Sequence, residues 1–320
     1  MATSGSAAQE GSGSSVTADP VTGIVPGQYW LQTAQNIAYD GDQDSALGSD
    51  GNAESTASIA SSILEYRTIQ GRTYHSERGN ARYWGLNDDQ QNESMDINDF
   101  ADQFPNTAVI GTDISPIQPS WVPPNLRFEI EDCTIVWTYP SDSFDYVHIR
   151  WLNGSIDDWG MVFKEAYRIC KPGGFIESFE GAPCLESDDG TVKDTDAVGQ
   201  WGKIFVEYGR RSGRSFTTVS SGIQKKAIQE AGFVAIEEKD IKTPIGDWSQ
   251  DPTLKDIGRY AHLALTKDVE GYLLLATSEL GWAKEESLVF AAQIRRELRS
   301  KKHHVYYRQK IVWGKKPEAS

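Results

Sequence analysis

Two aspartates in the middle of the chain each follow a short run typical of a β-strand. Asp113 ends the β-branched run AVIGTD, and Asp132 comes at the end of the alternating apolar run at residues 125–133. A third such run, at residues 142–151, ends near Arg150. Because ligands of open α/β sheets bind at the carboxyl ends of the strands, these three side chains are expected to converge. The first carboxylate can accept hydrogen bonds from both hydroxyls of a ribose, and the second from the exocyclic amine of adenine.

A helix and a further strand follow these three runs. Residues 158–174 carry apolar side chains at helical spacing and stop at Pro172-Gly173-Gly174, directly before the apolar run at 175–180. Each feature alone has a plain structural explanation, since Asp132 can also cap a turn. Their order and spacing together are much more specific, and they indicate the ligand-binding edge of a nucleotide-binding sheet.

The elements around this edge alternate between strands and helices. A short helix is expected to end before Pro105. Further helices are expected at 195–213, 219–232, 254–281 (one or two helices) and 284–300, and further strands at 233–246 and 303–317. This alternation predicts an α/β fold with a parallel sheet and helices on both faces.

The N-terminal part differs in composition from the rest. Eight acids and no Lys or Arg precede Arg67, so −8 of the net charge of −15 lies in the first 66 residues. We predict that residues 1–52 are a largely disordered acidic Gly/Ser-rich tail. Within this tail, the apolar stretch GIVPGQYW at 23–30 either docks on the protein or stays mobile. The acidic balance argues against direct nucleic-acid binding.

We expect two further segments after this tail. Residues 53–97 are predicted to form a helical N-terminal segment, and residues 98–317 the α/β domain. Helical insertions are expected in this domain at about 183–232 and 254–300.

Cysteine usage and hydropathy indicate where the protein works. Cys133, Cys170 and Cys184 have neither disulfide-like nor metal-ligand spacing, so we expect reduced thiols and no metal site. The sequence has no recognisable signal peptide and no apolar run long enough to span a membrane. These features predict a protein of the cytoplasm, the nucleus or both, with no membrane association.

The same motifs resemble a known family. The segments VIGTDISPIQPSWVPPN, FDYVHIRWLNGSIDDWGMVFKEAYRICKPGG and FAAQIRRELRSKKHHVYYRQKIVWGKKP are similar to those of class I S-adenosylmethionine-dependent methyltransferases. The resemblance is strongest to the fungal group around the secondary-metabolism regulator LaeA, and it covers about residues 54–317. It implies a Rossmann-like methyltransferase sheet with S-adenosylmethionine as the cofactor.

The resemblance also implies roles for five residues. Asp113 would hold the cofactor ribose, Ile114 would pack near the adenine, and Asp132 with Cys133 would border the adenine. Arg150 would end its strand beside the methyl-transfer pocket. No catalytic residue is assigned, because the sulfonium of the cofactor drives many methyl transfers and the protein then supplies mainly proximity and orientation. Glu180 follows the next strand and can face the site, but nothing in the sequence makes it a general base.

One part of the family pattern is missing. The first strand and its D-x-G-x-G-x-G turn belong before the ribose acid, where this chain reads QNESMD, and no glycine occurs between Gly85 and Gly111. Between about Ile97 and Asp99 the sequence passes directly from the family segment that precedes the first strand to the segment that follows the glycine turn. Without this part the sheet loses its central strand, and the amino-acid end of the cofactor loses the backbone that approaches it closely. Two explanations stay open: an incomplete gene model, or a divergent relative that has lost cofactor binding.

Two functions of different classes follow. The first is methyl transfer from S-adenosylmethionine to an unknown small-molecule or protein acceptor, in fungal secondary metabolism or its regulation. The alternative is a catalytically inactive, methyltransferase-like interaction protein that acts through a regulatory protein partner. A nicotinamide-dependent dehydrogenase is excluded because no G-x-G-x-x-G follows a strand.

Overall fold

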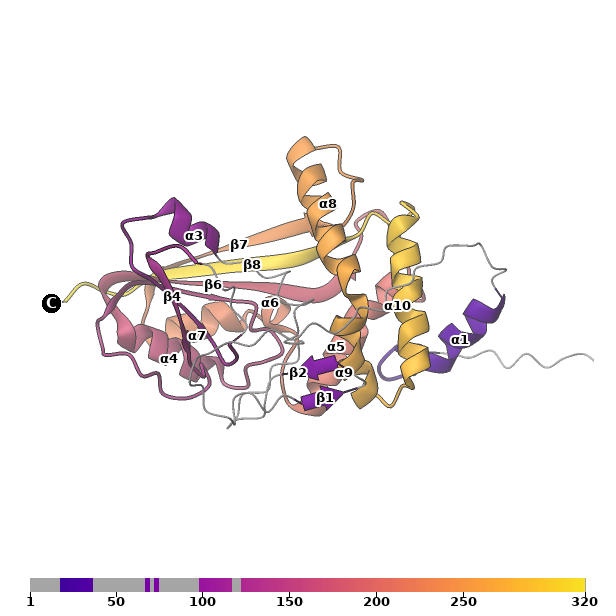
Figure 1. Ribbon diagram of the computed structural model, residues 1–320, viewed down its shortest axis with the longest axis horizontal. Helices are drawn as coiled ribbons and strands as arrows, with labels where there is room; N and C mark the ends of the chain where they lie inside the picture. The colour runs from indigo at the N-terminus through magenta and orange to yellow at the C-terminus, as the bar shows by residue number, and fades with distance from the viewer. Residues whose placement is uncertain (1–17, 37–66, 70–71, 75–97, 117–121, 320) are drawn as a thin grey trace, which may run out of the picture.

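The computed structural model describes residues 18–36, 67–69, 72–74, 98–116 and 122–319 of the chain. These residues form a mixed α/β fold in which the strands run through the middle of the molecule and the helices pack on and beyond them (Figure 1).

Two separate sheets carry the predicted sheet edge. β3 (Val109–Asp113) pairs in parallel with β4 (Leu126–Ile130). The second sheet has four strands in the order β5-β6-β8-β7. Its strands are β5 (Phe144–Arg150), β6 (Cys170–Glu186), β7 (Val234–Pro244) and β8 (Tyr306–Lys315). Among the described residues no strand joins β3 to β5, so the sheet is interrupted there.

The four-stranded sheet is mixed and not purely parallel. β5 and β6 are parallel, as predicted, but β8 enters between β6 and β7 and is antiparallel to both. The alternation of strands and helices does not reveal this order, because the last strand inserts beside strands that lie far away in the sequence.

Two groups of helices bury the apolar faces. α4 (Trp159–Ile169) and α7 (Ile223–Ala231) lie along the four-stranded sheet and form one core with it. α5 (Ala197–Ser212), α9 (Val269–Glu279) and α10 (Lys284–Arg299) form a second core near the end of β6 (Figure 1). The remaining described helices are α1 (Gly27–Asn36), α3 (Asn98–Gln103), α6 (Thr218–Ser221) and α8 (Pro252–Lys267).

Local sequence explains most of the element ends. The carboxylate of Asp158 caps α4 by accepting a hydrogen bond from the backbone N–H of Met161 at 3.0 Å. α4 ends at Ile169, earlier than predicted, and the chain continues as β6 from Cys170. The residue before a proline avoids helical geometry, so Pro172 already favours extended backbone at this point.

A further difference concerns the helix expected at 219–232. Gly222, with φ of 70°, separates α6 from α7. The positive φ breaks the helix at a residue that tolerates it.

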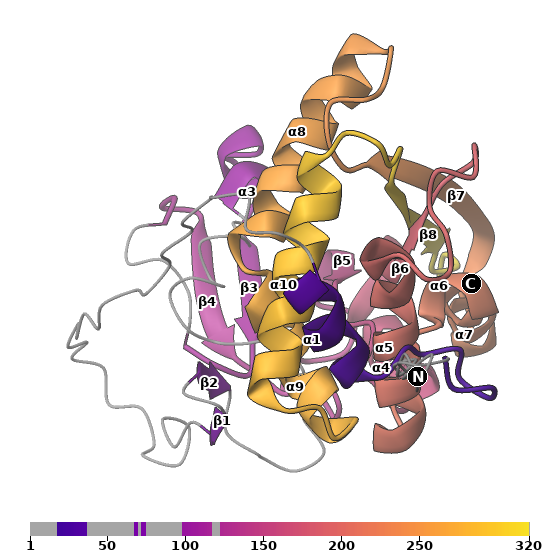
Figure 2. The same ribbon diagram turned by 90° about the vertical axis from the view of Figure 1, so that its right-hand side faces the viewer.

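The prediction of a disordered tail is wrong for residues 24–36. α1 (Gly27–Asn36) packs along α10, and the Trp30 ring lies 4.9 Å from the Phe290 ring (Figure 2). Val25 is buried and its backbone N–H donates to Oε1 of Gln200 at 2.8 Å. The apolar stretch therefore docks, because burying its large side chains outweighs the entropy of ordering the short segment.

Most of residues 53–97 lie outside the described residues, including nearly all of the helix predicted there. The described part is an antiparallel hairpin of β1 (Arg67–Ile69) and β2 (Arg72–Tyr74).

Candidate functional site

Acidic side chains from neighbouring strands lie near one thiol. Asp113 is the last residue of β3, Cys133 lies just beyond β4, and Glu180 lies within β6. Burial raises the pKa of the Cys133 thiol to about 12, and the charges of Asp132, Asp113 and Glu180 also raise it. Because β3 and β4 are parallel neighbours, Asp113, Asp132 and Cys133 lie at the same edge of the sheet.

Asp113 is held in a defined orientation. Its Oδ1 accepts the backbone N–H of Ser115 at 2.9 Å, which closes the turn after β3. Burial raises the pKa of the Asp113 carboxyl, while its hydrogen bonds from the backbone of Ser115 and Ile114 oppose that rise. Ile114 itself is half-buried beside this carboxylate. The turn thus fixes the Asp113 carboxylate at the end of β3.

Asp132 has contacts that fit both interpretations that the sequence left open, a cap for a turn and a charged group at the predicted ligand-binding edge. Its Oδ1 accepts the backbone N–H of Thr134 at 2.8 Å and the Thr134 hydroxyl at 2.6 Å. Asp132 thus caps a turn and at the same time presents its charge to Cys133. The carbonyl of Cys133 accepts the indole N–H of Trp137 at 3.1 Å, which fixes the turn on the core.

Arg150 ends β5 and is partly exposed. Its charge acts on His148 two residues earlier. Burial lowers the pKa of the His148 imidazole, the charge of Glu177 opposes this, and the charge of Arg150 lowers the pKa further. His148 Nδ1 lies 3.1 Å from a Glu177 carboxylate oxygen and 3.3 Å from the Tyr146 hydroxyl, so this histidine belongs to a group of polar contacts on β5 and β6.

Glu180 is the residue that sequence reasoning failed to assign. It is fully buried and accepts the backbone N–H groups of Leu152 at 3.1 Å and Asn153 at 2.8 Å. Burial raises the pKa of the Glu180 carboxyl to about 8. The alternation of side chains along β6 could have revealed that Glu180 is buried, because Glu180 shares its face with the fully buried Ile176 and Ser178. Glu180 therefore fixes the turn after β5 and is not a free base.

The turn after β5 connects this edge to the helical region. Trp151 adopts a positive φ of 57°, and Gly154 has a φ of 79°. The side-chain amide of Asn153 donates to the carbonyls of Gly181 at 2.9 Å and Phe216 at 3.3 Å. A Cβ on Gly154 would lie 2.2 Å from the Phe216 ring, so only glycine allows this close packing.

The described residues contain no cluster of three or more His, Cys, Asp or Glu side chains arranged to hold a metal ion. The ESDDG stretch forms a turn, in which the Asp189 carboxylate accepts the Ser187 hydroxyl at 2.6 Å and the backbone N–H of Thr191 at 3.1 Å. In the same part of the chain, no helix is both long and apolar enough to cross a lipid bilayer.

Comparison with known proteins gives the family. A family described as "Methyltransferase domain" matches residues 95–238. The secondary metabolism regulator LAE1 of Cochliobolus heterostrophus is 32% identical over 224 residues, which cover 69% of this chain and 72% of that protein. This chain belongs to the same methyltransferase family.

Other members of the family are methyltransferases by name. Methyltransferase pytC of Aspergillus terreus is 32% identical over 65% of this chain, and the match spans 64% of the length of pytC. Among solved structures, phosphoethanolamine N-methyltransferase 2 of Haemonchus contortus has 17% identity and a TM-score of 0.40, over 68% of this chain and 45% of that protein.

Family membership gives the interruption of the sheet a meaning. The resemblance implies that a first strand would lie between β3 and β5, and among the described residues these two strands are not joined. Residues 75–97, where the first strand would be expected, lie outside the described residues, so its absence stays a prediction.

Proposed function

We propose that this family member binds S-adenosylmethionine at the ends of β3 and β4 and transfers its methyl group to an acceptor. The observation that carries the proposal is that Asp113 ends β3 and that Asp132 and Cys133 directly follow its parallel neighbour β4, so that these side chains share one edge of the sheet. Relatives named as methyltransferases or as secondary metabolism regulators support a role in fungal secondary metabolism or its regulation.

The described side chains fit the nucleoside half of the cofactor. Asp113 is a half-buried carboxylate that can accept both ribose hydroxyls, with the apolar Ile114 beside it for the adenine. Asp132 and Cys133 would border the adenine ring, and Arg150 would lie beside the transferred methyl group. Glu180 would act by positioning the turn after β5, which faces the same edge. The bound cofactor supplies the activated methyl group, and these residues bind and orient it.

A second candidate is a non-catalytic, methyltransferase-like interaction protein. The interruption between β3 and β5 favours it, since a glycine-rich turn would normally lead out of the strand in that place. From Asn98 to Arg150 the sequence contains one glycine, Gly111, which lies inside β3. An incomplete gene model would leave the same gap, and the complete protein would then carry the strand and the turn.

Partners and location are part of the proposal. The methyl acceptor is a small molecule or a protein, and a regulatory protein partner is expected because several relatives are named regulators. Cys133, Cys170 and Cys184 are all free thiols, as is usual for proteins of reducing compartments, which supports the cytoplasm or the nucleus.

Calorimetric titration of S-adenosylmethionine into the purified chain tests the proposal. Asp113→Ala should weaken binding by about tenfold or more, because it removes a charged hydrogen-bond acceptor. The matched control is Asp194→Ala, whose carboxylate is exposed and pairs only with Lys203 at 3.4 Å. This control should bind like the wild type.

The titration separates three explanations. Saturable binding that Asp113→Ala abolishes supports the cofactor site. A chain that is folded by circular dichroism and does not bind supports the interaction protein. A chain that is unfolded or aggregated points to a missing coding segment, which sequencing of the transcript would reveal.

A further inference from the structure

A hollow of about 300 Å³ lies beside β6, where this strand leaves its partner β8. Gly181 pairs with Gln309 and Leu185 pairs with Tyr307. Three residues of β6 therefore stand opposite the single residue Arg308. Bulges of this kind bend a strand and occur often next to functional sites. The middle residue of the bulge is Pro183, which has no backbone N–H to place in the ladder.

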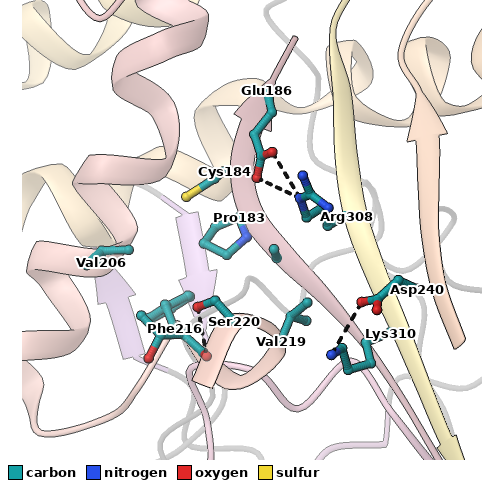
Figure 3. Close-up of a pocket in the computed structure, with 12 residues that line it drawn as sticks. Pro183, Cys184, Glu186, Val206, Phe216, Val219, Ser220, Asp240, Arg308 and Lys310 are labelled. Carbon is teal, nitrogen blue, oxygen red and sulfur yellow. Dashed lines mark hydrogen bonds and ion pairs between the residues drawn. The ribbon is translucent and has the colours of Figure 1, made fainter. Parts of the chain in front are cut away.

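The hollow has an apolar side and a charged side. Pro183, Val206, Phe216 and Val219 lie on the apolar side, and Figure 3 shows Arg308, Lys310 and Asp240 on the other. The volume is at the small end of the range of about 300–1,000 Å³ that is common for small-molecule pockets.

Arg308 and Lys310 stand on one face of β8 because they are two residues apart. Nε of Arg308 donates to both carboxylate oxygens of Glu186, at 3.0 and 3.2 Å. Within the described residues, the two terminal guanidinium nitrogens of Arg308 donate to no protein acceptor. These donors remain available for a planar anion such as a carboxylate.

Lys310 is the second available cation. Its side chain is only 14% exposed, and its Nζ lies 3.3 Å from an Asp240 oxygen and 3.9 Å from a Glu238 oxygen. In the described part of the chain its ammonium makes no hydrogen bond to either. Glu180 is opposite Lys310 on β6, but its carboxylate accepts hydrogen bonds from Leu152 and Asn153 instead. The largely buried ammonium is thus ion-paired at its exposed side with Asp240 and Glu238, and a bound anion would supply a further acceptor for its remaining donors.

The neighbouring acids do not block an anion. Glu186 is already bound by Arg308 and by the Tyr306 hydroxyl at 3.2 Å. Asp240 has a side chain that is 59% exposed, so water screens its charge.

We propose that this hollow binds a small amphiphilic carboxylate. The carboxylate lies on the terminal nitrogens of Arg308 and on Nζ of Lys310, and the apolar body lies against Phe216 and Val219. Phe216 also packs on Gly154 of the turn after β5. The lining of the hollow includes none of Asp113, Asp132, Cys133 and Arg150, so the site is distinct from the proposed cofactor site and does not depend on it.

Calorimetry with 4-phenylbutyrate as the probe tests this site in the purified chain. Its neutral analogue 4-phenylbutanamide and inorganic phosphate are the reference ligands. We expect 4-phenylbutyrate to bind saturably and the amide to bind about tenfold more weakly or worse, because it cannot form charged hydrogen bonds. Phosphate should bind more weakly than 4-phenylbutyrate, since it leaves the apolar side empty.

Variants connect this binding to the two cations. Arg308→Gln and Lys310→Gln should each weaken 4-phenylbutyrate by about tenfold, and Arg308→Lys should restore part of the loss. Lys315→Gln is the matched control, since Lys315 lies at the other end of β8 and pairs with Glu318 at 2.7 Å. Circular dichroism checks that each variant is folded. If Arg308→Gln does not fold, Lys310→Gln alone tests the proposal.

Four results would overturn the proposal. The first three are the absence of saturable 4-phenylbutyrate binding, equal affinity for acid and amide, and an affinity that Arg308→Gln and Lys310→Gln leave unchanged. The fourth is phosphate binding as tight as that of 4-phenylbutyrate, because the apolar body would then contribute nothing.

Discussion

The four-stranded sheet and the β3–β4 pair differ in how completely they are buried. In the four-stranded sheet, Ile176 and Val312 are fully buried between strands and helices. In the two-stranded β3–β4 pair, Ile130 remains 37% exposed, and Phe104, directly after α3, remains 48% exposed. Parallel strands normally need neighbours and helices on both sides. Among the described residues, the pair that carries Asp113 is therefore less completely packed than the four-stranded sheet.

The largest expected effect comes from the core of the complete sheet. Phe163 on α4 is fully buried and its ring lies 5.7 Å from that of Trp159. Phe163→Ala should lower the free energy of unfolding by about 3–5 kcal/mol. Phe104→Ala, beside the interrupted pair, should change it by no more than about 0.5 kcal/mol. Urea unfolding of both variants measures this difference, and equal losses would contradict the comparison.

A smaller effect is expected from Glu180, which links the complete sheet to the candidate site. Its pKa is about 8 in the folded protein, against an ordinary value of 4.5. The folded state thus binds an extra proton between these values, so its contribution to stability is greatest below about pH 4.5. That contribution falls as the pH rises through about 8.

Glu180→Gln removes this titration. Relative to the variant, the wild type should lose on the order of 2 kcal/mol between pH 5.5 and pH 8.5. Urea unfolding at both pH values gives the two free energies for each protein. Parallel pH profiles of wild type and variant would show that the Glu180 carboxyl is not perturbed.

The smallest expected effect is at the start of α4. Asp158→Ala removes the cap on the Met161 N–H and should cost about 1 kcal/mol. Asp158→Asn is the control, because asparagine caps a helix about as well as aspartate, and it should be nearly neutral. Thermal unfolding distinguishes them, and an equal loss in both variants would mean that the charge and not the cap matters.

The sequence by itself determined the elements and much of the site. Alternation and helical spacing located β3 to β8 and most helices, because periodicity reports which side of an element is buried. The acids Asp113 and Asp132 could be found because each stands at the end of such a run. The missing glycine turn was visible as well, since a required residue type was absent from a known position.

The tertiary structure decided what depends on distant partners. Trp30 packs on Phe290, and this contact turns a segment of polar composition into a docked helix. β8 inserts antiparallel between β6 and β7, and the bulge opposite Arg308 opens the hollow. Glu180 gained its role only when the turn after β5 came within hydrogen-bonding distance. Local patterns determine which faces are apolar, but long-range packing selects the partner of each face, and no single segment contains that information.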